Sequence, residues 1–223
     1  TVTNTVTTLG DELIEDSLFS DPNITPYSTN FQFADNSGNA IVSKQLIDGQ
    51  DTLLMYLEDG GGIGNADALN YVLQGLTPGV EYQLNISYII PSFLASMNLP
   101  LVGLLFGETI LVNNVPTLNF FYQNVLQNNV GNLSLNFTPS EQNVFIIFVN
   151  PNNPHINAGL TVPALSFGAI TKLSVANVVT TTSIFTDFEY YNLQNKPGWY
   201  VYDIHTNKQK GTLLAFIGVM IIT

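Results

Sequence analysis

The chain of 223 residues contains no cysteine and no arginine, and only five of its residues are basic. Without cysteine it has no disulfide, no thiolate metal ligand and no cysteine nucleophile. With 17 acidic and 5 basic side chains the formal net charge is −12. A protein with this much negative charge repels the phosphates of nucleic acid and the headgroups of anionic lipids. We therefore expect no nucleic-acid partner.

Charged residues of both signs are scarce, at 10% of the chain, whereas 45% of the residues are hydrophobic. This composition excludes a disordered acidic tail and differs from an ordinary cytosolic surface. Asparagine, with 26 residues, and threonine, with 21, take the place of charged side chains. An uncharged polar surface suits contact with other proteins or a matrix, because few charges lose their water on contact. The composition therefore favours an extracellular protein.

Long hydrophobic runs are also missing. The first eight residues lack the basic and apolar regions of a signal peptide, so we expect an exported protein in its processed form. The most apolar stretch, Leu213–Ile222, has ten residues, where a membrane-spanning helix needs about 20. It is rich in Ile and Val, which predicts a buried strand paired with Trp199–Ile204 through a polar turn at His205–Gly211. We expect no membrane span.

Short β-type runs separated by Gly, Pro and Asn clusters make up most of the chain. Val80–Ile90 alternates apolar and polar residues after a turn at Thr77–Gly79, and Asn132–Thr138 alternates in the same way. Val144–Val149 is apolar without alternation, which predicts that both of its faces are covered. The other predicted strands are Ala40–Leu46, Thr52–Leu57, Ala68–Leu73, Leu101–Phe106, Thr109–Val112, Leu118–Leu126, Phe167–Val175, Trp199–Ile204 and Leu213–Ile222. About twelve strands predict an all-β fold, a two-sheet antiparallel β-sandwich.

The domain organisation follows from the spacing of the strands and the charges. Residues 1–9 form an N-terminal strand, residues 10–177 a β-sandwich domain, and residues 178–223 additional C-terminal strands packed on the sandwich. Twelve of the seventeen acids lie before residue 82, and no charge occurs between Glu108 and Glu141. We expect the charge-free stretch to contact protein or glycan, or to form a neutral surface.

Three segments carry a family resemblance. They are Leu13–Phe19, Leu73–Leu84 with a Leu-Thr-Pro-Gly turn before a tyrosine-containing strand, and Phe167–Val175. Over residues 13–177 the chain resembles jelly-roll modules of the carbohydrate-binding type, which implies a jelly-roll sandwich and a sugar ligand. The family usually has an aspartate before the closing strand, where this chain has Gly168-Ala169. The resemblance therefore does not imply a structural calcium.

Four asparagines begin Asn-x-Ser/Thr sequons and are predicted glycosylation sites: Asn23, Asn85, Asn132 and Asn136. The last three lie on the polar phase of alternating strands, so their side chains should face solvent. Proline follows the sequons of Asn23 and Asn136 directly, which opposes modification there. In a chain with this much asparagine and threonine, about four sequons also arise by chance.

No group of residues predicts catalysis or metal binding. The glycine-rich segment Glu58–Asp67 offers at most three acidic ligands without the alternation of a calcium loop, and no Gly-Lys-Ser/Thr follows it. His155 and His205 lack the convergent groups of a triad or a zinc site. The acids within Asp11–Asp16 are sequence neighbours, unlike the separated carboxylates of a glycosidase. We expect no catalytic residue, metal or cofactor, and a protein that is not an enzyme.

Consecutive aromatic residues occur in Phe120–Tyr122, Tyr190-Tyr191 and Trp199–Tyr202. Neighbouring residues of a strand point to opposite faces, so some of these rings must point outward. Exposed rings stack on sugars and also serve protein contacts. Packing against an added strand or loop is the alternative.

The predicted function is that of a non-enzymatic extracellular structural protein, a subunit of a surface filament assembled by strand donation between copies of the chain. The donor would be residues 1–9, with Val2, Asn4, Val6 and Thr8 as the assembly strand. Gly10 and the acidic segment after it would let this strand leave its own domain and enter a groove of the next copy. By composition the chain is similar to secreted archaeal filament proteins, the threads and bundling pili.

Two alternatives remain open. The first is a carbohydrate-binding module, whose partner is a glycan. The second is a viral capsid or decoration jelly-roll protein, in which the absence of a basic arm argues against contact with the genome.

Overall fold

The protein is all-β in the residues that the structure, a computed structural model, describes. These are residues 2–21, 31–34, 40–59, 67–95, 97, 99–127, 131–156, 165–185, 200–203 and 208–213. The chain divides into two compact units, Leu9–Val178 and a second unit formed by Thr1–Thr8 with Val179–Thr223. No helix of the described residues is long and apolar enough to cross a membrane.

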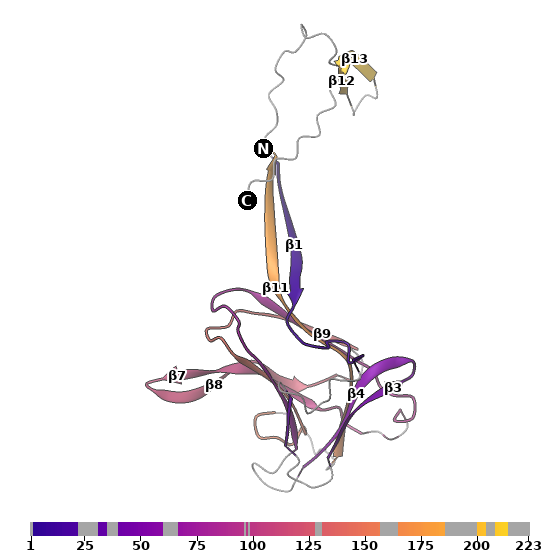
Figure 1. Cartoon of the computed structure of the whole chain (residues 1–223), viewed down its shortest axis with the longest axis vertical. Helices are drawn as coiled ribbons and strands as arrows, with labels where there is room; N and C mark the ends of the chain where they lie inside the picture. The colour runs from indigo at the N-terminus through magenta and orange to yellow at the C-terminus, as the bar shows by residue number, and fades with distance from the viewer. Residues whose placement is uncertain are drawn as a thin grey trace. The chain divides into compact units, whose positions relative to one another are not determined.

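Two sheets form the sandwich (Figure 1). The larger has six strands, in the order β3 (Ile41–Ile47), β4 (Gln50–Glu58), β11 (Leu165–Phe185), β6 (Tyr82–Tyr88) and β9 (Asn132–Phe137), with β1 (Val2–Glu12) also paired to β11. The other has the order β2 (Phe31–Ala34), β5 (Ala68–Leu73), β10 (Val144–Val149), β7 (Gly103–Val112) and β8 (Val115–Val125). The ladders within these two orders are antiparallel. The predicted fold class, a two-sheet antiparallel β-sandwich, is confirmed.

The core lies between the sheets because the strands alternate buried and partly exposed residues. In β5 and β6 every second side chain is buried, which is the period of two seen in the sequence. Aromatic rings fill one part of the core: Phe106 lies 4.7 Å from Phe137 and 5.2 Å from Phe121 between ring centroids. This packing holds the inner faces of the two sheets together.

Two predicted strands, Leu101–Phe106 and Thr109–Val112, are one strand, β7. Its partner β8 begins at Val115, and the two are joined by Asn113 and Asn114, with φ of 52° and 63°. Two positive φ angles at the turn are typical of a type I′ hairpin, and asparagine tolerates them better than most residues. The two predicted strands left out Gly107 and Glu108, whereas β7 continues through both residues.

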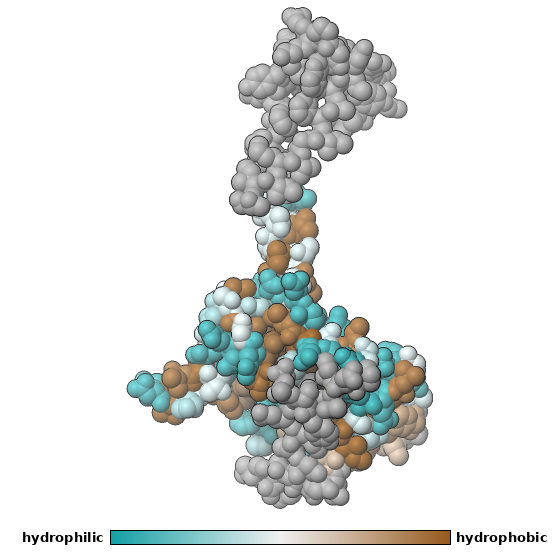
Figure 2. All heavy atoms as spheres, viewed as in Figure 1, coloured by the Kyte–Doolittle hydropathy of each residue, from teal (hydrophilic) through white to brown (hydrophobic). Residues whose placement is uncertain are grey.

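The β7–β8 hairpin extends beyond the rest of its sheet. Strand β10 pairs with β7 only from Gly103 to Gly107, so the following residues of the hairpin form a two-stranded arm. Figure 1 shows this arm projecting from the sandwich, and Figure 2 shows apolar and polar residues interleaved on it. The exposed apolar side chains of the arm are Leu111, Val112, Val115 and Leu118.

The N-terminal strand is paired with a strand of its own chain. Strand β1 pairs with β11, which has 21 residues and is much longer than the predicted Phe167–Val175. Where β1 ends, the carboxylate of Glu12 accepts hydrogen bonds from the Val175 backbone N–H, at 2.9 Å, and from the Ser174 hydroxyl. The extended β11 thus supplies β1 with an edge within the same chain, and insertion of Val2, Asn4, Val6 and Thr8 into another copy stays a prediction.

The C-terminal region has a strand pair, but its second strand is Lys208–Leu213 and not the predicted Leu213–Ile222. Strand β12 (Tyr200–Asp203) pairs with β13 (Lys208–Leu213), and Tyr200 lies opposite Leu213. Residues 208–211, predicted as turn, belong to the strand. Residues 214–222, predicted to form the second strand, lie outside the described residues.

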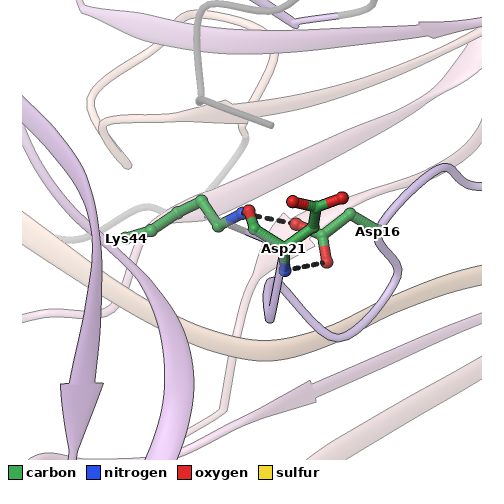
Figure 3. A network of polar contacts seen from close by, with 3 residues as sticks. All are labelled: Asp16, Asp21 and Lys44. Carbon is green, nitrogen blue, oxygen red and sulfur yellow. Dashed lines mark hydrogen bonds and ion pairs between the residues drawn. The ribbon is translucent and has the colours of Figure 1, made fainter. Parts of the chain in front are cut away.

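A buried ion pair attaches the segment after β1 to the larger sheet (Figure 3). The Lys44 ammonium of β3 contacts a carboxylate oxygen of Asp16 and the backbone carbonyl of Asp21. The other carboxylate oxygen of Asp16 accepts a hydrogen bond of 2.9 Å from the Asp21 backbone N–H. The side chains of Lys44 and Asp16 are only 15% and 4% exposed. Both charges are thus largely removed from water and depend on each other.

We predict that Lys44→Met destabilises the protein by about 3 kcal/mol, because the buried Asp16 carboxylate loses its counter-charge. The double variant Lys44→Met, Asp16→Asn should recover part of this loss. Urea unfolding of both variants measures the free energies. Lys172→Met, which removes a lysine that is not in this network, is the control and should change stability little. Equal effects of the two lysine variants would contradict the prediction.

Candidate functional site

A groove of about 760 Å³ lies on the outer face of the five-stranded sheet. Residues of four adjacent strands form its floor, and loops before and after β10 form its sides. The lining side chains include Asn70 and Val72 of β5, Phe145 and Ile147 of β10, Leu105 of β7, Phe120 of β8, and Glu141, Asn143, Asn153 and His155 of the loops.

The groove exists because the outer face of β10 is covered by other residues over only part of its length, whereas its inner face is fully buried. Ile146 and Phe148 face the core and are completely buried, whereas Phe145 and Ile147 on the outer face are half-buried. The prediction that both faces of Val144–Val149 are covered is therefore wrong for these two residues. At the Val149 end a loop residue, Ile156, packs over the outer face.

A row of residues across the sheet brings two aromatic rings together. The registers place Val72 opposite Phe145, Phe145 opposite Gly107, and Gly107 opposite Phe120. The rings of Phe120 and Phe145 meet edge to face, with centroids 5.9 Å apart and planes at 80°. A Cβ atom on Gly107 would lie 3.0 Å from the Phe145 ring and 2.2 Å from a backbone oxygen. Glycine at this position is therefore required for the two rings to meet.

The strand β8 has a bulge at this row. The register shifts between Phe106 and Gly107, so that Phe121 is the extra residue. Phe121 points inward and packs on Phe106 and Phe137, while Phe120 lines the groove. The prediction that some of the consecutive aromatics point outward is confirmed by Phe120. The side chains of Tyr200 and Tyr202 and the segment 186–199 lie outside the described residues.

The loop on one side of the groove is held by a buried carboxylate. Glu108 of β7 is 1% exposed and accepts hydrogen bonds from the backbone N–H groups of Ser140 and Glu141, at 2.8 and 3.0 Å. It also accepts hydrogen bonds from the Ser140 hydroxyl and the Asn119 amide. The loop that follows supplies Glu141 and Asn143 to the groove. Glu108 points away from the groove, into the protein, and from there it holds the loop that forms this side of the groove.

Burial of Glu108 would by itself raise its pKa, since a charge loses its water. The four hydrogen bonds, of which the Ser140 hydroxyl bond is the strongest contribution, favour the ionised form and outweigh burial, so the pKa of Glu108 is below its ordinary value. The carboxylate is therefore charged at neutral pH.

The opposite side of the groove is a turn anchored in the core. Asn150 is completely buried, and its amide donates to the Leu57 carbonyl at 3.0 Å. Its side-chain oxygen accepts the backbone N–H of Asn152, and its backbone carbonyl accepts that of Asn153. This turn places the His155 ring 5.5 Å from the Phe120 ring. The sequence did not single out His155 as a groove residue, because its proximity to Phe120 depends on tertiary structure.

One polar atom of the groove has no partner. The side-chain oxygen of Asn70 is buried and, among the described residues, is the one buried side-chain nitrogen or oxygen atom without a hydrogen bond. Leaving an amide oxygen buried and unpaired costs about 1–3 kcal/mol. Such an atom in a native structure indicates a place where a water molecule or ligand completes the hydrogen bonding.

Three of the four predicted glycosylation sites lie on the other sheet. Asn85, Asn132 and Asn136 are on the outer face of β6 and β9, and Asn132 and Asn136 are exposed. The amide of Asn85 donates to Gln83, and that of Asn136 donates to Glu81. Asn132 also borders a second hollow of about 610 Å³ with Lys172. Glycosylation at these positions stays a prediction, and Asn23 lies outside the described residues.

The acidic segment Glu58–Asp67 is described only at its ends. Asp67 is completely buried and its carboxylate accepts the Glu58 backbone N–H at 2.8 Å, so it closes the ends of the segment. Within the part of the chain that the structure describes, no group of three or more His, Cys, Asp or Glu side chains could hold a metal ion. His205 and residues 60–66 lie outside that part.

Comparison with known proteins gives similar folds at low identity. No protein-family model matches the chain, and no curated protein matches it. The CBM22-1 xylan-binding domain of Paenibacillus barcinonensis Xyn10C is 9% identical with a TM-score of 0.46, over 76% of this chain and 96% of that domain. A CBM4 structure is 13% identical with a TM-score of 0.44, over 74% of this chain and 99% of that one.

A third similar structure is the enzymatically active domain of tailspike protein 4 of bacteriophage CBA120. It is 11% identical with a TM-score of 0.43, and the match covers 67% of this chain but only 19% of the tailspike chain. Two of the three structures are carbohydrate-binding modules, the class that the sequence resembles over residues 13–177. The likeness is one of fold.

We predict that Glu108→Gln destabilises the protein by about 2 kcal/mol at pH 7, because the amide offers one acceptor oxygen where the carboxylate offers two. Since the pKa of Glu108 is lower in the folded than in the unfolded protein, its contribution is present above the ordinary carboxyl pKa of about 4.3. This stabilising contribution is lost as the pH falls through the pKa that Glu108 has in the folded protein. The stability difference between variant and wild type should therefore narrow in acid.

Urea unfolding at pH 7 and at pH 3 measures this difference. Glu141→Gln is the matched control, since Glu141 is the exposed neighbour whose backbone, not its side chain, binds Glu108. A difference that is the same at both pH values would show that the carboxylate charge of Glu108 is not what stabilises the loop.

Proposed function

We propose that the protein is a non-enzymatic extracellular carbohydrate-binding protein, and that the groove on the five-stranded sheet is its binding site. The observation that carries the proposal is the pair of partly exposed rings, Phe120 and Phe145, beside amide side chains in a concave site. Sites for small molecules combine an apolar lining with a few placed polar groups. Apolar ring faces next to amides are suited to the alternating C–H and hydroxyl surfaces of sugars.

The shape of the site supports a preformed binding surface. Its floor consists of strands that are hydrogen-bonded to one another, and both of its side loops are anchored by buried polar residues, Glu108 and Asn150. Little conformational entropy is lost when a ligand meets a surface that is already ordered. This matters for sugars, which offer little apolar area and bind weakly without such preorganisation.

The surface filament and its donor strand stay predictions, and the pairing of β1 with β11 within the chain gives them no support. The viral capsid alternative also stays a prediction. No contact of the described residues favours either, whereas the groove favours the carbohydrate-binding alternative.

The test is affinity electrophoresis of the purified full chain in gels that contain a neutral soluble polysaccharide. The panel comprises arabinoxylan, mixed-linkage β-glucan, glucomannan and galactomannan. We expect retardation by at least one of these and weakening by at least about fivefold in Phe120→Ala and Phe145→Ala, because truncating a central aromatic contact costs more than about 1 kcal/mol. Retardation by none of the four would contradict the proposal.

Phe93→Ala is the matched control. Phe93 is a phenylalanine that is 53% exposed in the turn between β6 and β7 and does not line the groove. Its loss should leave retardation unchanged. Thermal unfolding of all three variants separates loss of binding from loss of folding.

A further inference from the structure

The unpaired oxygen of Asn70 lies in an apolar part of the groove floor. Asn70 is opposite Ile147 on β10, and Ile147 is opposite Leu105 on β7. On its own strand the neighbours on the same face are Ala68 and Val72. None of these four side chains can donate a hydrogen bond. The other cross-strand neighbour of Asn70 is Gln32 of β2, whose side chain lies outside the described residues. Among the described neighbours the acceptor thus lies between apolar side chains and has no donor.

This position is adjacent to the aromatic row. Val72 and Phe145 form the cross-strand pair next to the Asn70–Ile147 pair on the same face of the sheet. Same-face neighbours one step along a strand lie about 7 Å apart. A ring-shaped ligand that stacks on Phe145 therefore brings its substituents within reach of Asn70. Those substituents are the donors that the acceptor lacks.

The charge of the groove restricts the ligand further. Its ionisable lining residues are Glu141 and His155, and neither lysine nor arginine lines it. In a chain of net charge −12, a carboxylated or sulfated sugar would meet repulsion and no cationic partner in the described lining. A neutral sugar meets no such penalty.

We propose that Asn70 is a specificity-determining residue of the groove, whose side-chain oxygen accepts a hydrogen bond from a hydroxyl of a neutral sugar bound against Phe145. The inference rests on the proposed carbohydrate-binding function. It assigns to Asn70 a directional role that the aromatic rings cannot perform, because ring stacking tolerates many hydroxyl arrangements. A site that offers a buried acceptor discriminates against a ligand that lacks the matching donor.

The test uses Asn70→Leu and Asn70→Ala in the full chain. Leucine has nearly the shape of asparagine and removes the unpaired oxygen, so Asn70→Leu should unfold at a higher temperature than the wild type in the absence of ligand. The same variant should bind at least about tenfold more weakly to the polysaccharide of the panel that retards the wild type most. Asn70→Ala should lose binding to the same extent without the gain in stability.

The control is Asn124→Ala, which removes an exposed amide of β8 that does not line the groove and should leave binding unchanged. Binding by Asn70→Leu and Asn70→Ala that equals the binding by this control would overturn the inference and would mean that a water molecule alone completes the Asn70 site. That outcome leaves the proposed function standing. Absence of wild-type binding to all four polysaccharides would instead overturn the proposed function, and this inference with it.

A second arm measures ligand charge. Polygalacturonate, an acidic polysaccharide, should not retard the wild type. Stronger retardation by polygalacturonate than by every neutral member of the panel would contradict the assignment of a neutral ligand, while leaving carbohydrate binding in place.

Discussion

Strand β10 is hydrogen-bonded along both edges, to β5 and to β7, and the rest of the sandwich depends on this central position. Its inward side chains, Ile146 and Phe148, are fully buried and join the two sheets. Because successive side chains of a strand point to opposite faces, the same pairing sets Phe145 and Ile147 on the outside. The core and the floor of the groove are therefore two faces of one strand, and neither can shift register without the other.

Small and buried polar residues give the groove its form. Gly107 leaves the space in which Phe120 and Phe145 meet, and Gly103 leaves the space for Ile156 over the neighbouring row. Glu108 and Asn150 then hold the two side loops through hydrogen bonds that are removed from water. A buried group with all of its hydrogen bonds made is rigid, because releasing it leaves several polar atoms unpaired at once. The aromatic rings thus project from a framework whose loops are fixed.

The extended strand β11 changes how the N-terminal residues should be understood. A nine-residue strand rich in Thr and Val cannot be stable alone, and the sequence offers no reason to choose a partner within the chain over one outside it. The choice is made by the length of β11, which continues well past Val175 and presents an edge to β1. The segment Ala176–Phe185 carries the Thr and Val residues of a strand, but its pairing with residues more than 160 positions away is a property of the fold.

By itself the sequence determined the elements with local periodicity. The alternation in Val80–Ile90 and Asn132–Thr138 indicated strands with one solvent-facing side, and β6 and β9 have that form. The sequence could show this because a period of two depends only on residues that are neighbours in the chain. The same reasoning indicated that some of the rings at 120–122 point outward.

Only the tertiary structure decided which residues make the groove. Asn70, Phe120, Phe145 and His155 are separated by up to 85 positions, and strand pairing, a bulge and a glycine bring them together. A continuous apolar run such as Val144–Val149 carries no information on which of its faces remains open. That depends on what the rest of the chain places over each face.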